Sequence, residues 1–112
     1  MRAGTEERLE TSAGTMDTMW VFNVNTAQAN DRIRHDRYEV IRAAILRALP
    51  SVGNGMTWEE LVEAVAPRLP NGMFPHMGSV RWYSKTVQLD LEARGWIEHV
   101  PGSGPLRLRC IA

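Results

Sequence analysis

Apolar and polar side chains alternate along two short runs in the N-terminal third of the chain. Residues 20–25 (WVFNVN) place apolar side chains at every second position, and residues 32–34 (RIR) repeat the alternation after a polar stretch. A period of two residues is typical of a strand with one buried face. The sequence therefore predicts an N-terminal β-ribbon or hairpin over residues 20–35.

The pattern then changes to the spacing of a helix. Apolar side chains recur every three or four residues over 37–49, and Pro50 ends the run. Asp36 precedes the segment and is expected to cap it, because an aspartate oxygen accepts hydrogen bonds from the free amides of a first turn. The side chains expected in the core are Tyr38, Ile41, Ile45, Ala48 and Leu49.

A second helix is predicted to begin at Trp58. Thr57 and Glu60 have the S/T-x-x-E spacing, in which the hydroxyl and the carboxylate each accept from a free backbone amide at the helix start. Pro67 is expected to end or bend this helix. The side chains expected in the core are Trp58, Leu61, Val62, Val65 and Leu69. The side chains expected to face water are Glu59, Glu60 and Glu63.

A third helix is predicted over 79–94, after a Pro- and Gly-rich loop over 70–78, with Ser79 as its cap and Gly95 as its stop. At about 100° per residue its apolar side chains fall on two nearly opposite faces. One face carries Val80, Tyr83, Val87 and Leu91, and the other Trp82, Leu89 and Ala93. Each face needs a surface that covers it, because apolar area left in water costs free energy.

Two strand-like runs, 96–100 and 106–110, flank the Gly/Pro-rich segment 101–105 and predict a C-terminal hairpin. One side of its second strand carries Leu106, Leu108 and Cys110, and the other Arg107 and Arg109. The elements together predict an α+β fold: a three-helix core with a C-terminal β-hairpin and an N-terminal β-ribbon.

Composition and charge bound the domain. A chain of 112 residues, 44% of them apolar, buries a core without disulfides or metals. Residues 1–19 are polar with a net charge of −2 and are expected to form a disordered tail, which leaves 20–112 as one domain. The lone cysteine, Cys110, and the lack of a membrane-length apolar run or a secretion signal predict a cytoplasmic protein with no membrane partner.

The order of elements over 37–110 resembles the winged helix-turn-helix superfamily, whose third helix commonly ends in Leu-x-x-x-Gly followed by two apolar residues. Leu91, Gly95, Trp96 and Ile97 match that ending. The strings RWYSKTVQLDLEARG (81–95) and VFNVN (21–25) are also similar to a family of small bacterial proteins of unknown function built on this core. The narrower resemblance implies no activity.

The winged-helix resemblance implies a DNA-binding protein, such as a transcription regulator, with double-stranded DNA as its partner. The third helix would enter the major groove, and the hairpin tip would lie beside the phosphates or the minor groove. The helix candidates are Ser79, Arg81, Trp82, Lys85 and Thr86, and the hairpin candidates are Ser103, Arg107 and Arg109.

Three features depart from a DNA-binding pattern. The loop over 70–78 is longer than the usual turn of about three or four residues, the second helix exposes three glutamates, and the hairpin tip has no basic residue. Residues 20–112 contain 11 basic and nine acidic side chains, so the charge that would attract phosphates is small.

The outward indole and leucine of the third helix support a second hypothesis, a protein-interaction or dimerisation module with no nucleic-acid role. Burial of the Trp82 and Leu89 side chains is worth about 1.5–3 kcal/mol each, so another molecular surface is expected to cover them. The chain's own ribbon, a second copy in a homodimer and nucleic-acid bases are the three alternatives. The interaction surface would comprise Trp20, Phe22, Trp82 and Leu89.

The sequence contains no spacing typical of catalysis, cofactor binding or metal binding. The glycines over 53–55 and 102–104 fit turns, and neither pair precedes a helix with the lysine or third glycine of a phosphate loop. His76 lies between two methionines without a second histidine, cysteine or carboxylate nearby. We therefore expect no enzyme activity, cofactor or metal, and the sequence identifies no small-molecule substrate.

Overall fold

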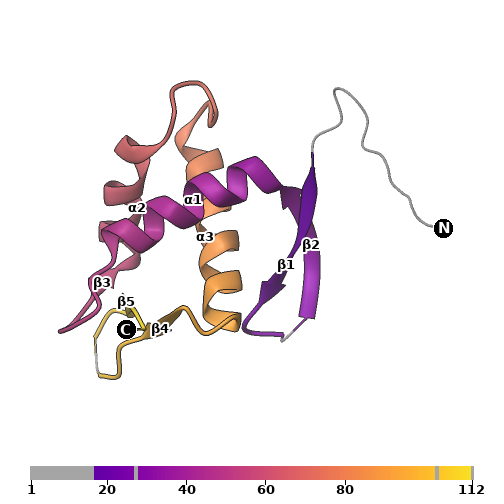
Figure 1. Ribbon diagram of the computed structural model, residues 1–112. Coiled ribbons are helices and arrows are strands. Elements are labelled where there is room, and N and C mark those ends of the chain that lie inside the picture. The colour runs from indigo at the N-terminus through magenta and orange to yellow at the C-terminus, as the bar shows by residue number, and fades with distance from the viewer. Residues whose placement is uncertain (1–16, 27, 103, 112) are drawn as a thin grey trace.

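The computed structural model describes residues 17–26, 28–102 and 104–111. In this part of the chain three α-helices combine with two small antiparallel sheets, which confirms the predicted α+β class (Figure 1). A two-stranded ribbon lies at one end of the helical core, and a three-stranded sheet lies at the other.

The N-terminal ribbon consists of β1 (Thr18–Asn23) and β2 (Gln28–Arg34), paired antiparallel as predicted. The predicted boundary of the tail at residue 19 is wrong, because residues 18 and 19 already belong to β1. The predicted disorder of residues 1–16 lies outside the described residues. Val21 and Ile33 point into the core, whereas Trp20 and Phe22 occupy the alternate, outward positions of β1. The larger apolar side chains of the ribbon therefore face solvent.

Helix α1 (His35–Ala48) begins directly after β2, earlier than predicted. The predicted cap at Asp36 is wrong, because the N-cap position is Arg34 and Asp36 lies inside the first turn. There the Asp36 carboxylate accepts a hydrogen bond from the Arg34 guanidinium, with 2.7 Å between Nη2 and Oδ2. The strand thus passes into the helix without a capping residue between them.

Helix α2 (Trp58–Val65) has the predicted start. The Thr57 hydroxyl accepts from the Glu60 amide at 3.2 Å, and the Glu60 carboxylate accepts from the Thr57 amide at 2.9 Å, which confirms the capping box. The helix passes into a single 3₁₀ turn, η1 (Ala66–Arg68), at Pro67.

Helix α3 (Met77–Ala93) begins two residues before the predicted start. The predicted cap at Ser79 is wrong, because His76 holds the N-cap position and its Nδ1 accepts from the Ser79 amide at 3.2 Å. Gly95 ends the helix as predicted, with a φ of 80° and a hydrogen bond from the Trp96 amide to the Leu91 carbonyl.

The second sheet contains β3 (Met56–Thr57), β4 (Ile97–His99) and β5 (Arg107–Cys110), in the order β3-β5-β4. Strands β4 and β5 are the predicted hairpin, although Leu106 precedes β5 and is exposed. Strand β3 was not predicted, because two residues are too few to show an alternation.

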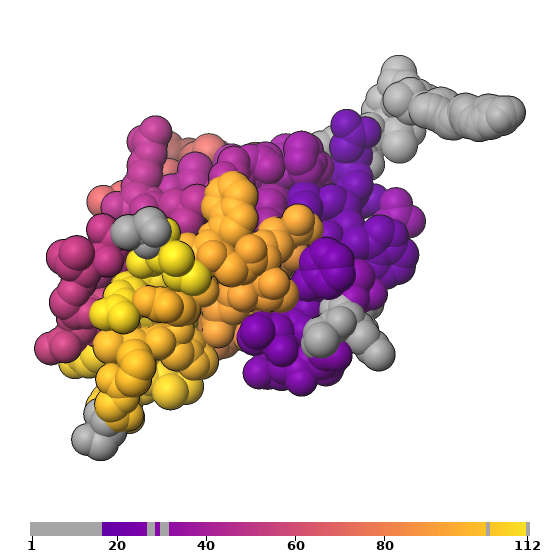
Figure 2. All heavy atoms as spheres, turned by 60° about the horizontal axis from the view of Figure 1, so that its bottom comes forward, coloured from indigo at the N-terminus to yellow at the C-terminus, as the bar shows by residue number. Residues whose placement is uncertain are grey.

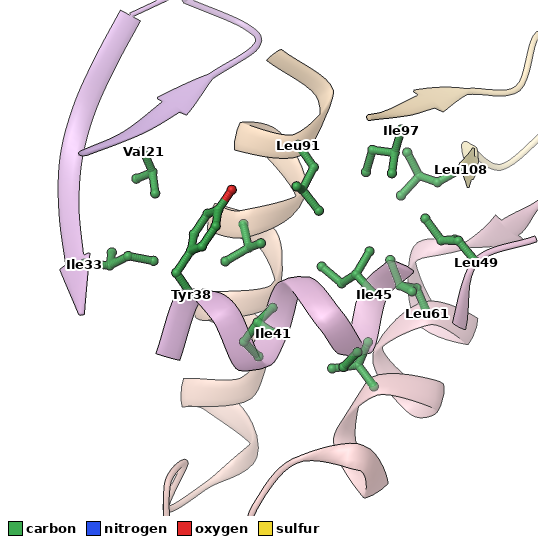
Figure 3. Close-up of a cluster of buried hydrophobic side chains, with 13 residues drawn as sticks. Val21, Ile33, Tyr38, Ile41, Ile45, Leu49, Leu61, Leu91, Ile97 and Leu108 are labelled. Carbon is green, nitrogen blue, oxygen red and sulfur yellow. The ribbon is translucent and has the colours of Figure 1, made fainter. Parts of the chain in front are cut away.

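Most side chains of the predicted helical stripes are buried in a core that continues into both sheets (Figure 3). The predicted residues Ala48, Trp58, Leu69 and Tyr83 are partly buried against this core. Tyr38 and Ile45 of α1 lie between the ribbon side chains at one end and Ile97 and Leu108 at the other. The buried polar side chains on α3 are Ser84, Gln88 and Asp90, none of which the apolar pattern had indicated.

Candidate functional site

The outward side of α3 carries the basic residues predicted to reach DNA, but Arg81 is paired there with an acidic side chain. Two of its guanidinium nitrogens donate to the Glu59 carboxylate of α2, the shorter contact being 2.6 Å. The Arg81 guanidinium lowers the pKa of Glu59 below its usual value, and the carboxylate raises the pKa of Arg81. A phosphate group that binds Arg81 would therefore have to displace the Glu59 carboxylate.

Lys85 lies over the ring of Trp58, with Nζ 4.3 Å from the ring centroid, and donates to Oε1 of Gln88 at 3.0 Å. Burial lowers its pKa. The Gln88 amide group in turn donates to Glu92, and Glu92 lies 3.1 Å from Nε2 of His99. Lys85 is thus the first member of a series of polar contacts along α3 and is not a free cation.

The two hairpin arginines are also close to carboxylates. Arg107 lies 3.7 Å from Glu60, and Arg109 donates to Glu98 at 2.7 Å, as expected for a cross-strand pair. Ser103 lies outside the described residues. The three arginines predicted to contact DNA therefore each lie beside a carboxylate, whereas Lys85 donates to the neutral Gln88.

The remaining helix candidates, Ser79 and Thr86, are half-buried. The Ser79 hydroxyl lies 3.4 Å from Nε2 of His76, so it belongs to the helix start. Neither side chain stands out from the surface of α3.

Trp82 and Leu89 are not brought together with the ribbon aromatics. The Trp82 indole is 51% exposed and packs edge-on against Tyr83 at 5.0 Å between ring centroids, while Leu89 is half-buried. In the described part of the chain no ring contact joins Trp82 to Trp20 or Phe22. About half of the Trp82 indole therefore remains exposed, so the chain's own ribbon does not fully cover it.

The ribbon is attached to the C-terminal half of α3 through Asp90, a residue that the apolar pattern did not indicate. Its carboxylate is fully buried and accepts from the Phe22 amide at 2.8 Å, from Nε of Arg94 at 2.7 Å and from the Tyr38 hydroxyl. Burial and the adjacent carboxylate raise the pKa of Tyr38. The only sequence signal was an aspartate between the core positions Val87 and Leu91.

The outward side of the ribbon presents exposed apolar side chains with arginines over two of the rings. We call this set the ribbon face and define it by Trp20, Phe22, Val24 and Arg32 of the ribbon together with Arg94 at the end of α3. Trp20 is 54% exposed, Phe22 39% and Val24 37%. The Arg32 guanidinium lies 5.6 Å from the Trp20 ring centroid, and that of Arg94 lies 5.3 Å from Phe22. Figure 2 shows this ribbon beside the C-terminal end of α3.

A groove of about 350 Å³ lies between the ribbon and that end of α3. Phe22 and Val24 line it from the ribbon side, and Glu92 and Ala93 line it from the helix. Its walls combine apolar side chains with the Glu92 carboxylate, and it adjoins the ribbon face because both contain Phe22 and Val24.

Within the described ranges, no group of three histidine, cysteine or carboxylate side chains is arranged to hold a metal ion. None of the helices in these ranges combines the length and apolar character needed to cross a membrane. Partial burial raises the pKa of the Cys110 thiol.

A protein-family model described as a family of unknown function, DUF6958, matches residues 18–108, which is most of the chain. The chain belongs to DUF6958. No curated protein and no solved structure matches it. The DUF6958 match begins at the first residue of β1, so the family domain includes the ribbon as well as the helices and the second sheet.

Proposed function

We propose that this DUF6958 chain is a non-enzymatic cytoplasmic protein-interaction module that forms a homodimer through its ribbon face. The observation that carries the proposal is the exposure of Trp20 and Phe22 on a ribbon whose buried apolar residues are Val21 and Ile33. Large apolar patches on a protein surface commonly mark interaction sites. Contact with a partner would remove these rings from water.

The composition of the ribbon face supports a protein partner. Tryptophan and arginine dominate the binding energy of protein interfaces, and aromatic residues are enriched there. Arg32 and Arg94 lie over the rings of Trp20 and Phe22, which reduces the freedom of these side chains before binding. An ordered surface loses less entropy on association.

A second copy is the occupant that this surface fits best. In a two-fold symmetric interface the same patch serves both subunits, so it must present a projection and a matching hollow. The ribbon face has both: Trp20 projects from it, and the groove beside Phe22 accepts an apolar side chain. Each copy would place Trp20 against the groove of the other.

The proposed dimer is tested by light scattering across a wide range of protein concentration. The wild-type chain should change from monomer to dimer as the concentration rises. Trp20→Gln should weaken the dimer at least about tenfold, because loss of a central aromatic side chain commonly costs about 2 kcal/mol or more. Trp96→Gln is the matched control, since Trp96 is 46% exposed and lies against Arg42 of α1 instead of on the ribbon.

A wild-type chain that remains monomeric at every concentration would exclude the homodimer. Equal weakening by the two tryptophan variants would remove the ribbon face as its site. If Trp82→Gln alone dissociated the dimer, the interface would lie on the outward side of α3.

DNA binding on a winged-helix core is the second candidate, and the order of elements favours it. A short strand between α1 and α2 pairs with the last strand of the hairpin, and the hairpin follows the third helix. This order supports the winged-helix resemblance. The N-terminal half of α3 also presents Arg81 and Trp82 on its outward side.

The ion pairs weigh against DNA as the principal partner. Exposed salt bridges are worth only about 0–1 kcal/mol, so Arg81 and Arg107 are able to leave their glutamates for phosphates. The glutamates would nevertheless remain beside the DNA and repel it. The net electrostatic attraction on which non-specific DNA affinity depends would therefore be small.

The DNA candidate is tested by the salt dependence of duplex binding. If α3 contacts phosphates, changing both Arg81 and Lys85 to alanine should flatten the slope of log affinity against log salt by about two contacts. Arg42→Ala, on α1, is the control and should leave the slope unchanged, because Arg42 pairs with Glu39 on the same helix. Failure of the intact protein to shift any duplex at low salt would end this candidate.

A further inference from the structure

A second hollow, of about 370 Å³, opens at the surface between α1 and turn η1 and shares no residue with the ribbon face. Helix α1 contributes apolar and basic side chains from neighbouring turns, and the segment that follows α2 closes the other side. The lining residues are Val40, Ala43, Ala44, Arg47, Arg68 and Pro70.

The charge of this hollow differs from that of the outward side of α3. Its lining contains two arginines and no acidic residue. Arg68 uses one nitrogen, Nη1, to donate to the Ala64 carbonyl at 2.7 Å, which leaves its other N–H groups for a ligand. Arg47 has neither an ion pair nor a hydrogen-bond partner among the described residues, whereas Arg81 and Arg109 are each held by a carboxylate.

The floor of the hollow determines which anions suit it. Val40, Ala43 and Pro70 present aliphatic surface, which gains from contact with an apolar ligand body but offers no hydrogen bond. A guanidinium binds a planar carboxylate through two parallel hydrogen bonds. The volume lies at the lower end of the range of about 300–1,000 Å³ that is typical of small-molecule pockets.

We propose that this hollow binds a small organic carboxylate, with its apolar body on the α1 surface and its carboxylate between Arg47 and Arg68. Inorganic phosphate would gain the charge interaction without the apolar contact and would bind more weakly. A neutral ligand of the same shape would gain only the apolar contact. The site is independent of the proposed homodimer.

The test is a titration of the full chain with benzoate, benzamide and inorganic phosphate at matched ionic strength, followed by the amide resonances in nuclear magnetic resonance spectra. Benzoate should shift the amides of Val40, Ala43 and Arg47 and saturate. Benzamide and phosphate should bind at least about fivefold more weakly, because each lacks one of the two contacts.

Two variants separate the parts of the site. Arg47→Gln should weaken benzoate binding about tenfold, because a charge-assisted contact is lost. Ala43→Leu should weaken it by filling the hollow with no change of charge. Arg42→Gln, on α1, is the control and should bind benzoate as the wild type does, because Arg42 pairs with Glu39 and does not line the hollow.

The proposal is overturned if benzoate causes no saturable shift at these amides, or if benzamide binds equally well. It is also overturned if phosphate shifts the same amides with equal affinity, which would indicate general anion attraction. Unchanged benzoate affinity in both Arg47→Gln and Ala43→Leu would remove the site from this hollow. Dimer formation is measured separately by light scattering, so the two proposals fail independently.

Discussion

Replacing Asp90 with alanine is expected to reduce the free energy of unfolding by about 4 kcal/mol, the largest effect of any carboxylate in the described chain. The substitution removes the acceptor of three hydrogen bonds at once. The Phe22 amide and the Tyr38 hydroxyl would be left without a hydrogen-bond acceptor, and Arg94 would lose its ion-pair partner. Unfolding by urea, followed by tryptophan fluorescence, measures the loss.

The matched control is Asp36→Ala, which removes another aspartate that is paired with an arginine. Asp36 is partly exposed, and exposed pairs contribute about 1 kcal/mol or less. Hydrogen exchange at the Phe22 amide gives a second readout, because release of the ribbon should make this amide exchange faster in Asp90→Ala. A loss below about 1 kcal/mol in Asp90→Ala would show that Asp90 does not anchor the ribbon.

Replacing Gly55 with alanine is expected to destabilise the three-stranded sheet by about 3 kcal/mol or more. Gly55 has a φ of 72°, a conformation that costs a residue with a side chain about 1–3 kcal/mol. A Cβ added there would also lie 2.1 Å from the backbone oxygen of Leu108 and 3.1 Å from Cγ2 of Val100. Since Leu108 pairs with Met56, the next residue, relieving the collision would separate β3 from β5.

Gly53→Ala separates the two causes of this effect. Gly53 has a similar φ of 76°, but a Cβ added there would have no heavy atom within 4 Å. The Gly53→Ala variant should therefore lose only about 1–2 kcal/mol of its free energy of unfolding, which is the cost of placing a side chain on a left-handed backbone. Urea unfolding of both variants gives the comparison, and equal losses would contradict the steric argument for Gly55.

Features that depend on residues close in the chain were predictable from the sequence. The capping box at Thr57 and Glu60, the stop at Gly95 and the core stripes of the three helices all follow from spacings of five residues or fewer. Local hydrogen bonds and helical geometry determine such features wherever the segment lies in the fold. The incorrect caps at Asp36 and Ser79 arose where another residue had already taken the cap position.

The candidate surfaces were less predictable, because they depend on which distant residues meet. The alternation in β1 identified two faces but not which one is buried, and the smaller face, with Val21, turned inward. The charge of Arg81 was visible in the sequence, but its pairing with Glu59 required the packing of α3 beside α2.

The sequence by itself therefore determined the three helices, the ribbon and the hairpin, their order, most of the helical core stripes and the chain's balance of charge, because each depends on the identity and spacing of nearby residues. Only the tertiary structure decided that Asp90 holds the ribbon, that the predicted DNA-contacting arginines are neutralised and that Arg47 and Arg68 share a hollow. These features join residues up to 68 positions apart, and their free energies arise only after the helices pack.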